Sequence, residues 1–142
     1  MLIPLKKDQY ALRAIFELAK QKDNGPIKIS DIAAIQSIPV RFLEVILNQL
    51  KGSGLVDSKR GFYGGYYLVK SPENISVGDV LRYFQGKTDP TQCTACVSKK
   101  DCPHHGNCAF SAMWMSVKKA AFKIFDETSI QDLINKEKMS GG

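Results

Sequence analysis

Apolar residues recur at helical spacing in the first stretch of the chain, between Lys7 and Lys20. The apolar positions of this stretch are Tyr10, Ala11, Ala14, Ile15, Leu18 and Ala19. Spacings of three and four residues place such side chains on one face of a helix, so the pattern predicts an amphipathic first helix. The run KDNGP that comes soon after Lys20 contains two helix breakers and predicts its end.

Two more helices are predicted directly downstream. The segment IKISDIAAIQSIP predicts a short helix capped by Ser30, followed by a tight turn. Pro39 suits the first position of the next helix, where a missing N–H costs nothing, and Gly52 suits a left-handed C-terminal position. The apolar face of this third helix comprises Leu43, Ile46, Leu47 and Leu50. Two short helices joined by a few residues predict a helix-turn-helix.

A hairpin follows the third helix. The segments LVDSKR and YYLVK are rich in strand-forming residues, and they flank the glycine-containing stretch GFYGG. Glycines supply the positive backbone angles that tight hairpin turns need. A hairpin after a helix-turn-helix predicts the wing of a winged-helix domain.

Further helices are predicted on both sides of a cysteine-rich segment. Ser76 caps a short helix over VGDVLRYFQ, and a later apolar stripe has offsets of 0, 3, 4, 7, 11 and 14 residues. The stripe comprises Phe110, Met113, Trp114, Val117, Ala121 and Ile124. We interpret it as the seam of a homodimer, because it lies beyond a complete winged domain; the alternative is that it packs on its own domain. Thr128 and Gln131 predict a capping box for a last helix, before the polar tail EKMSGG.

The pattern therefore predicts a mainly α fold with a small β-hairpin wing and a long C-terminal dimerisation helix. We divide it into a winged helix-turn-helix at 1–86, a cysteine-rich loop at 87–109, and a dimerisation helix with its tail at 110–142. These parts are expected to form one structural unit, since 142 residues suffice for one domain with a substantial core.

Charge and hydropathy narrow the class of protein. Twenty basic and fourteen acidic side chains give a formal charge of +6, which is typical of proteins with a polyanionic partner, although it also serves solubility. No segment approaches the roughly 18 apolar residues that cross a bilayer, and the N-terminus becomes charged too early for a signal peptide. We expect a cytoplasmic protein without a membrane partner.

Candidate DNA-reading residues lie on the third helix and on the wing. A helix-turn-helix places the start of its second helix in the major groove. The residues at that start and opposite the apolar face are Val40, Arg41, Glu44 and Asn48. Arg41 can donate two hydrogen bonds to guanine, and Glu44 can accept one from cytosine. Lys59 and Arg60 suit phosphate contacts or a narrow minor groove. The alternative is that these are solvated surface charges.

All four cysteines and both histidines lie between Cys93 and Cys108. In a reducing cytoplasm, clustered thiols more often bind metal or react than form disulfides. Cys96, Cys102 and Cys108 stand with five residues between neighbours, and Trp114 follows after five more. Thiolates at such spacing can converge on a soft metal centre. Tetrahedral zinc is the first alternative, and a redox-reactive loop is the second.

At this point the sequence resembles the IscR/NsrR/RirA-type iron-sulfur transcription regulators. The resemblance covers nearly the whole chain: YALRAIFELA, IPVRFLEVILNQLKGSGLVDSKRGFYGGYYL, ISVGDVL and the C-x5-C-x5-C-x5-W spacing. It implies a homodimeric winged-helix regulator of double-stranded DNA. Three cysteines would bind an iron-sulfur cluster that senses iron, redox or nitric oxide status, and loss or oxidation of the cluster would change DNA affinity. Arg41 and Glu44 would lie on the recognition helix, and Arg60 would open the wing.

The resemblance leaves the ligand set open. Where IscR-like members have a histidine after the third cysteine, this chain has Ser111; where NsrR-like members have an acidic residue, it has Gln9, with Asp8 beside it. Cys93 and Cys96 compete for the first position or both bind, and His104 and His105 are less favoured ligands.

Several broader questions also stay open at this stage: a two-iron or four-iron cluster, the operator, and activation or repression. We expect no enzyme, because the chain has no Gly-rich phosphate loop and no nucleophile elbow. The other candidate functions are a zinc-bound winged-helix DNA-binding protein and, in another class, an iron-sulfur electron carrier.

Overall fold

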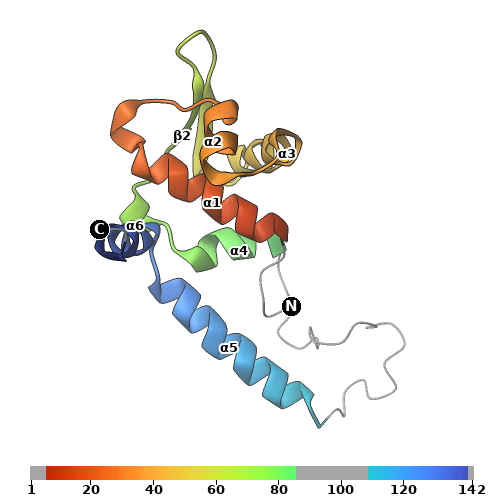
Figure 1. Ribbon diagram of the computed structural model, residues 1–142. Helices are drawn as coiled ribbons and strands as arrows, with labels where there is room; N and C mark the ends of the chain where they lie inside the picture. The colour runs from red at the N-terminus through yellow and green to blue at the C-terminus, as the bar shows by residue number, and fades with distance from the viewer. Residues whose placement is uncertain (1–5, 86–108, 141–142) are drawn as a thin grey trace.

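The computed structural model describes residues 6–85 and 109–140, and its fold is mainly helical with one antiparallel hairpin (Figure 1). In chain order the helices and strands are α1 (Lys6–Lys20), η1 (Lys22–Asn24), α2 (Ile29–Gln36), α3 (Val40–Lys51), β1 (Val56–Lys59), β2 (Gly65–Leu68), η2 (Pro72–Asn74), α4 (Val77–Gln85), α5 (Ser111–Glu127) and α6 (Ile130–Ser140). The predicted fold class, a winged helix-turn-helix followed by a long helix, is confirmed. The four cysteines and two histidines lie outside the described residues.

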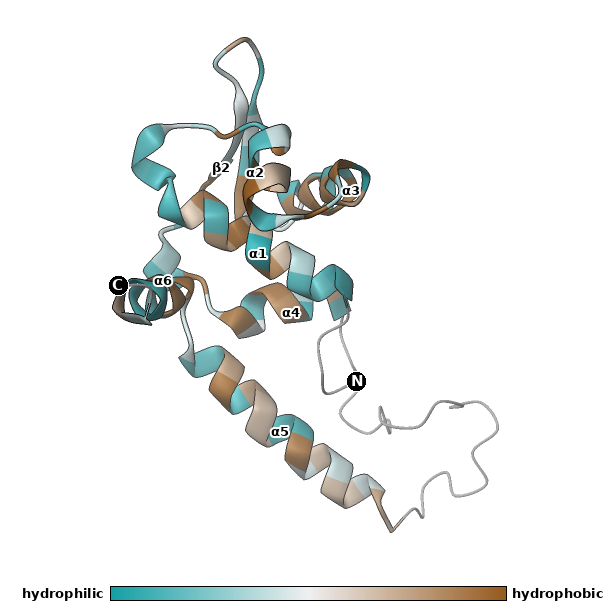
Figure 2. Ribbon diagram, in the orientation of Figure 1, coloured by the Kyte–Doolittle hydropathy of each residue, from teal (hydrophilic) through white to brown (hydrophobic). Residues whose placement is uncertain are grey.

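Helix α1 forms the centre of the core. It contacts α2, α3, α4, α6 and β2, and its apolar face is fully shielded at Ala11, Ala14 and Ile15. Ile130 and Ile134 of α6 join the same core cluster, so the C-terminal helix packs against the winged part of the chain. Figure 2 shows that brown and teal segments alternate along α1 and around α3, as expected of helices with one buried and one solvent-facing side.

The hairpin pairs Val56 with Leu68 at its base and Lys59 with Gly65 near its tip. A third extended segment joins it through Ile27, whose N–H and carbonyl both bond to the backbone of Tyr66. Gly65 has a φ of +152°, and a Cβ there would lie 2.4 Å from the Ile27 backbone. This close approach requires glycine at the point where the hairpin meets the segment before α2.

Three predicted helix ends differ from the structure. Helix α2 begins at Ile29 after Lys28 and has no side-chain cap, so the prediction that Ser30 caps it was wrong. Pro39 is the N-cap of α3 and not its first residue. Helix α3 ends at Lys51 with Gly52 as its C-cap, as predicted, but Gly52 has a right-handed φ of −74° and the positive φ of +80° occurs at Gly54.

The caps of the C-terminal elements follow one chemical pattern. Ser76 Oγ accepts the Asp79 N–H at 3.0 Å, and the Asp79 carboxylate accepts the Ser76 N–H, so the predicted cap of α4 is confirmed as a capping box. The box of α6 joins Ser129 and Asp132 in the same way, and not Thr128 and Gln131. Helix α6 runs to Ser140, so most of the predicted polar tail is helical.

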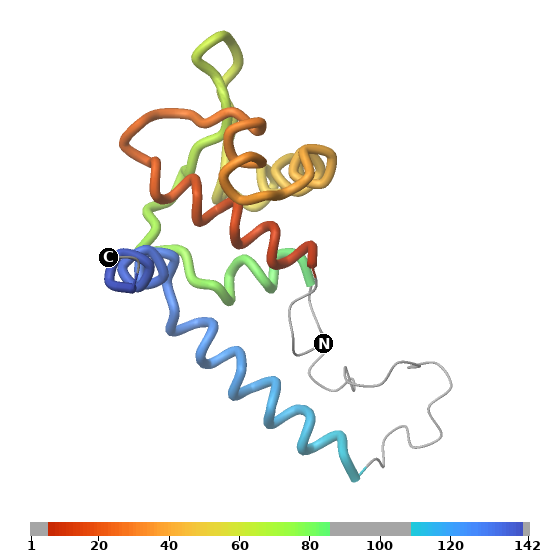
Figure 3. The backbone as a smooth tube through the Cα atoms, viewed as in Figure 1, coloured from red at the N-terminus to blue at the C-terminus, as the bar shows by residue number. Residues whose placement is uncertain are grey.

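Helix α5 runs away from the rest of the molecule, as the tube view shows clearly (Figure 3). It contacts α4 near its C-terminal end, and none of its residues is buried. No helix within 6–85 or 109–140 combines the length and apolarity that a bilayer crossing requires.

Candidate nucleic-acid interface

The outward face of α3 is the first part of the candidate site. Leu43, Leu47 and Leu50 are completely buried and fix the inward face of the helix. The predicted reading residues Val40, Arg41, Glu44 and Asn48 are all exposed. Helix α2 packs on α3, and the turn between them contains Ser37 in a left-handed conformation, with a φ of 55°. Helix α3 is thus packed against α2 while its polar face is open to solvent.

Val45 belongs to this face, although the sequence pattern did not single it out. Its side chain is 56% exposed, and it lies four residues after Arg41 and three before Asn48, spacings that share one helical face. An exposed apolar side chain on a recognition helix can contact the methyl group of thymine. The available signal was that Val45 stands outside the apolar stripe of the helix.

The hairpin is the second part of the candidate site. Lys59 ends β1 and Arg60 begins the tip, and both are exposed. Strand β1 contacts α3, and Figure 1 shows the hairpin extending beyond α2 and α3 at the same end of the molecule. Cationic side chains on the hairpin and the polar face of α3 therefore belong to one end of the molecule.

Helix α4 contacts the C-terminal end of α3 and directly precedes the cysteine segment in the sequence. The Tyr83 hydroxyl donates to the Gln49 carbonyl at 2.5 Å, close to the C-terminus of α3. Lys7 Nζ lies 5.3 Å from the ring centroid of Phe84, which joins α4 to the first turn of α1. Since α4 ends at Gln85, the chain enters the segment 86–108 directly from this junction.

The candidate fourth ligands are placed differently from one another. Asp8 and Gln9 both lie in the first turn of α1, but Asp8 is 3% exposed whereas Gln9 is exposed. Ser111 is the first residue of α5, at the end of that helix away from the body (Figure 1). Two residues after Asp8, the Tyr10 ring lies against Phe42 of α3 at a tilt of 39°, with ring centroids 6.5 Å apart. The first turn of α1 therefore adjoins the start of the recognition helix.

No group of three or more histidine, cysteine, aspartate or glutamate side chains that could hold a metal occurs in the described parts of the chain. The candidate metal ligands of the sequence, the thiols between Cys93 and Cys108, lie outside these parts. Four thiols in sixteen residues are a donor set that fits soft metals, including iron-sulfur clusters and zinc.

A buried carboxylate holds the helix-turn-helix to α1. Glu17 is 2% exposed and accepts hydrogen bonds from Gln21 and from Gln36 of α2, both at 2.9 Å. Its ion pair with Lys20 is 3.3 Å long, and Lys20 also reaches Glu137 of α6. Burial raises the pKa of Glu17, but the hydrogen bonds from Gln21, Gln36 and Lys20 together outweigh it, so the pKa lies below its ordinary value. Sequence reasoning missed this network. The spacing of Glu17 from Lys20 and Gln21 was an available signal, whereas the contacts with Gln36 and Glu137 join separate helices.

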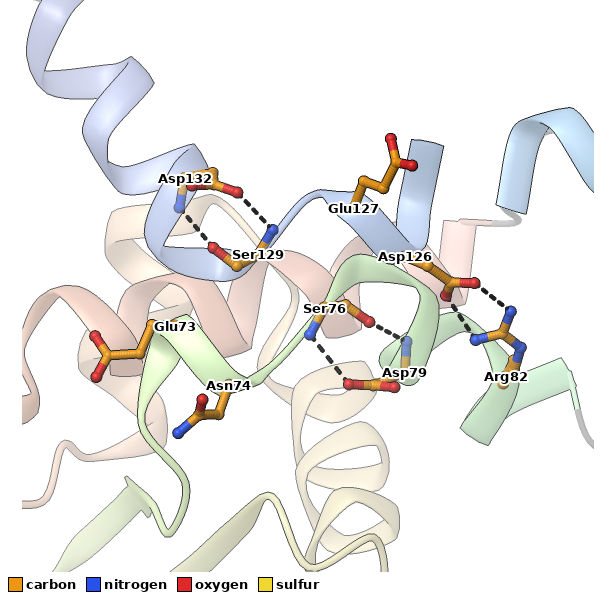
Figure 4. A pocket seen from close by; sticks show the side chains of 9 residues that line it. All are labelled: Glu73, Asn74, Ser76, Asp79, Arg82, Asp126, Glu127, Ser129 and Asp132. Atoms are coloured by element: carbon orange, nitrogen blue, oxygen red, sulfur yellow. Dashed lines mark hydrogen bonds and ion pairs between the residues drawn. The ribbon is translucent and has the colours of Figure 1, made fainter. Parts of the chain in front are cut away.

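An acidic depression lies where α4, α5 and α6 meet (Figure 4). It is lined by Glu73, Asn74, Ser76, Asp79, Arg82, Asp126, Glu127, Ser129 and Asp132. The Asp79 and Asp132 carboxylates are engaged in the two capping boxes, and Arg82 pairs with both oxygens of Asp126 at 2.6 and 2.7 Å. That pairing lowers the pKa of Asp126 and raises the pKa of Arg82. The depression is thus a structural junction.

The predicted dimer stripe is open to solvent over much of α5. Exposed side chains of the stripe are Phe110 (62%), Met113 (47%), Val117 (42%) and Ile124 (64%), whereas Trp114 and Ala121 are half-buried. Helix α5 contacts α4 through its opposite face. There the Arg82 guanidinium of α4 lies over the Phe122 ring, 4.9 Å from the ring centroid. Within the described part of the chain, these four side chains are left largely open to solvent.

Comparison with known proteins supplies the family context. A model of the Rrf2 family, described as iron-dependent transcriptional regulators, matches residues 5–136. The HTH-type transcriptional regulator CymR of Bacillus subtilis (strain 168) is 32% identical over 127 residues, which cover 89% of this chain and 86% of CymR. The regulator IscR of Escherichia coli (strain SMS-3-5 / SECEC) is 29% identical over 133 residues, covering 94% and 80%.

Solved structures are similar over the same length. The IscR structure from T. potens superposes with a TM-score of 0.77 at 29% identity, covering 94% of this chain and 87% of that one. The structure of CymR, the global cysteine regulator of B. subtilis, gives 0.76 at 31% identity, covering 96% and 98%. Both the fold and the class of protein therefore agree with the resemblance inferred from the sequence.

Proposed function

Because the chain belongs to the Rrf2 family of transcriptional regulators and is not an enzyme, we propose that it binds operator DNA under the control of an iron-sulfur cluster. One observation carries the proposal. A winged helix-turn-helix with an open polar face on α3 is joined, through α4, to a segment that holds every cysteine of the chain. The description of the family as iron-dependent supports iron as the metal. A protein that binds operator DNA would act in the cytoplasm.

The DNA contacts divide between α3 and the hairpin. Arg41 and Asn48 can donate to base edges in the major groove, and Glu44 can accept from cytosine while it repels phosphates. Lys59 and Arg60 supply positive charge for the backbone or a narrow minor groove. In this arrangement Glu44 contributes base selection, and the two cations contribute affinity that depends little on sequence.

The cysteine segment holds the proposed cluster through Cys102 and Cys108 together with Cys93, Cys96 or both. Asp8 or Gln9 in α1 is the candidate fourth ligand, and Asp8 has the more buried position of the two. When bound, a cluster supplies a redox-active and iron-dependent crosslink between the segments that ligate it. Zinc would supply the crosslink without the redox response.

Residues of α4 and α1 provide a physical route from that segment to the DNA-reading face. Tyr83 holds the end of α3 through the Gln49 carbonyl, and Tyr10 packs on Phe42 near its start. A shift of α4 or of the first turn of α1 would therefore reposition the recognition helix from both ends. Ligation in 93–108 can bias that position and so change DNA affinity.

Dimerisation through α5 completes the proposal. The exposed stripe on this helix is long and apolar, and a second copy of the same helix would cover Met113, Trp114, Val117, Ala121 and Ile124. A two-fold dimer would also present two recognition helices to a palindromic operator. This part rests on the exposed apolar face and on the family.

Anaerobic purification followed by an absorption spectrum and by iron and sulfide analysis tests the proposal. We expect a coloured protein containing both elements, and DNA affinity that changes when the cluster is removed. Cys102→Ser and Cys108→Ser should abolish the chromophore, whereas Cys93→Ser and Cys96→Ser should differ or lose it only in part. A colourless, zinc-loaded protein would support the zinc alternative, and full cluster content in Cys102→Ser or Cys108→Ser would contradict the ligand assignment.

A further inference from the structure

The tip of the hairpin carries two aromatic side chains that the α3 and Arg60 contacts do not use. Phe62 is 79% exposed and Tyr63 is 85% exposed. The Gly64 N–H donates to the Gly61 carbonyl at 3.0 Å, which closes a four-residue turn with Phe62 and Tyr63 at its two central positions. Both side chains therefore project from the end of the hairpin.

The two rings form a defined shape. Their centroids are 5.0 Å apart and their planes meet at 85°, an edge-to-face arrangement that aromatic pairs favour. A Cβ on Gly64 would lie 2.1 Å from the Lys59 carbonyl oxygen, so the turn is tight and its conformation depends on glycine. The apolar tip is consequently presented on a closed support.

The surroundings of the tip are basic. Lys28, at the start of α2, places its ammonium 5.1 Å from the Phe62 ring centroid, and Lys59 and Arg60 directly precede the turn. Asp57 is the nearest acidic residue along the strand, two positions before Lys59. An apolar wedge surrounded by three cations is complementary to a groove lined by phosphates.

We propose that Phe62 and Tyr63 enter the minor groove of DNA beside the major-groove segment read by α3, with Phe62 as the wedge. The minor groove of B-DNA is about 6 Å wide, which admits a planar ring on edge, and apolar side chains inserted there bend the duplex. The inference rests on DNA binding by α3 and the hairpin within the proposed function, and it does not depend on the cluster. With Phe62 as a wedge, DNA affinity would also depend on how easily the sequence bends, a property that is independent of hydrogen bonds to the bases.

Phe62→Ala is the decisive variant. The probe is a fluorescently labelled duplex selected by the wild-type dimer from a random-sequence pool, titrated at several salt concentrations. We expect about tenfold weaker binding, which corresponds to the loss of one aromatic–DNA contact. The salt dependence should not change, because no charge is removed, whereas Arg60→Ala should reduce its slope by about one unit.

Hydroxyl-radical footprinting of the same duplex locates the contact, because this reagent attacks the sugars from the minor groove. We expect a protected minor-groove patch beside the α3 site that disappears in Phe62→Ala and returns in Phe62→Trp. Met139→Ala is the matched control, since Met139 is 85% exposed on α6, far along the chain from the hairpin. It should bind as the wild type does.

The outcomes separate this inference from the proposed function. Equal affinity and equal footprints for wild type and Phe62→Ala would overturn the wedge and leave the DNA-binding proposal intact; the exposed pair would then suit a protein partner. A wild-type protein that enriches no duplex from the random-sequence pool would overturn both.

Discussion

At the scale of single residues, the Glu17 side chain holds the helix-turn-helix to α1. Its carboxylate is buried between α1 and α2, where it accepts bonds from Gln21, Gln36 and Lys20. Lys20 extends the network to Glu137 on α6. A buried charge is tolerated only when it is paired and hydrogen-bonded, and these partners meet that need. The network therefore ties α2, which supports the recognition helix, to the core and to the C-terminal helix.

Glu17→Gln should lower the free energy of unfolding by about 1–3 kcal/mol at neutral pH, because the amide replaces one acceptor oxygen with a donor and leaves a half-buried donor without its acceptor. The pKa of Glu17 is lowered in the folded state, so its contribution is complete above the unfolded-state pKa of about 4.3 and is lost as pH falls through the folded value. The difference between variant and wild type should thus shrink in acid. Urea unfolding at several pH values measures it, with exposed Glu73→Gln as control. Equal stabilities at neutral pH would show that the network is unimportant.

Two exposed residues of the candidate interface should have separable effects on DNA. Arg60→Ala should weaken binding to a selected operator and to a scrambled duplex alike and should reduce the salt dependence, since a phosphate or groove contact depends little on sequence. Glu44→Ala should relax base choice and leave non-specific affinity unchanged or tighter, because it removes both a base acceptor and a repulsion from phosphates. Titrations of both duplexes test this, and equal losses on both for Glu44→Ala would remove its assigned role.

At the scale of elements, the junction of α4 with α5 depends on a glycine. Arg82 of α4 pairs with both carboxylate oxygens of Asp126 on α5, as Figure 4 shows. Gly78 lies one turn before Arg82, and a Cβ there would approach Asp126 Oδ1 to 1.9 Å. The absence of a side chain at Gly78 is therefore what allows this ion pair to form against α4.

Gly78→Ala should destabilise the junction, although alanine in a helix normally stabilises by about 1 kcal/mol relative to glycine. The new methyl group displaces the Asp126 carboxylate and separates it from Arg82. In an Asp126→Ala background the obstacle is gone, and the same Gly78→Ala change should become neutral or stabilising. Thermal unfolding of the two single variants and the double variant measures this coupling. Additive effects would mean that Gly78 and Asp126 do not interact.

The element ends show what local sequence can specify. Ser76 could be identified as a cap because a serine oxygen accepts an otherwise unpaired N–H of the first helical turn, and Asp79 satisfies the Ser76 N–H in return. Thr128 and Ser129 are both good caps, and the choice between them depends on the Thr128 hydroxyl, which donates to the Ile124 carbonyl of the preceding helix. Such choices need the neighbouring element, so sequence alone placed them one or two residues away.

In the candidate interface, too, some features could be predicted from local sequence and others needed the tertiary fold. The exposed positions on α3 could be predicted, because the leucine stripe fixes which face is buried. The Tyr83 bond to Gln49 and the Lys28 contact with Phe62 could not, since each joins residues that only the tertiary fold brings together. Phe62 and Tyr63 were recognised as turn residues, but periodicity carries no information about how far a hairpin tip stands from the core.

At the scale of the whole molecule, the cysteine segment lies in the chain between the winged helix-turn-helix, which ends with α4, and helix α5. It follows α4, which holds both α1 and the end of α3, and it precedes α5, which carries the exposed stripe. Ligation in this segment would therefore act on the reading face and on the proposed dimer helix together. In the proposed function, a metal centre at this position in the chain could set both the spacing of two recognition helices and the orientation of each.

The dimer proposal yields a direct prediction for α5. Val117 is 42% exposed within one chain, and Val117→Asp should abolish the dimer because association would bury an unpaired charge. Met115 is 45% exposed and lies two residues away, on another face of the helix, so Met115→Asp adds the same charge at similar exposure and should leave the dimer intact. Sedimentation velocity at micromolar concentration distinguishes the two variants, and circular dichroism confirms that each is folded. A dimer that persists in Val117→Asp, or dissociation in both variants alike, would show that the stripe does not form the seam.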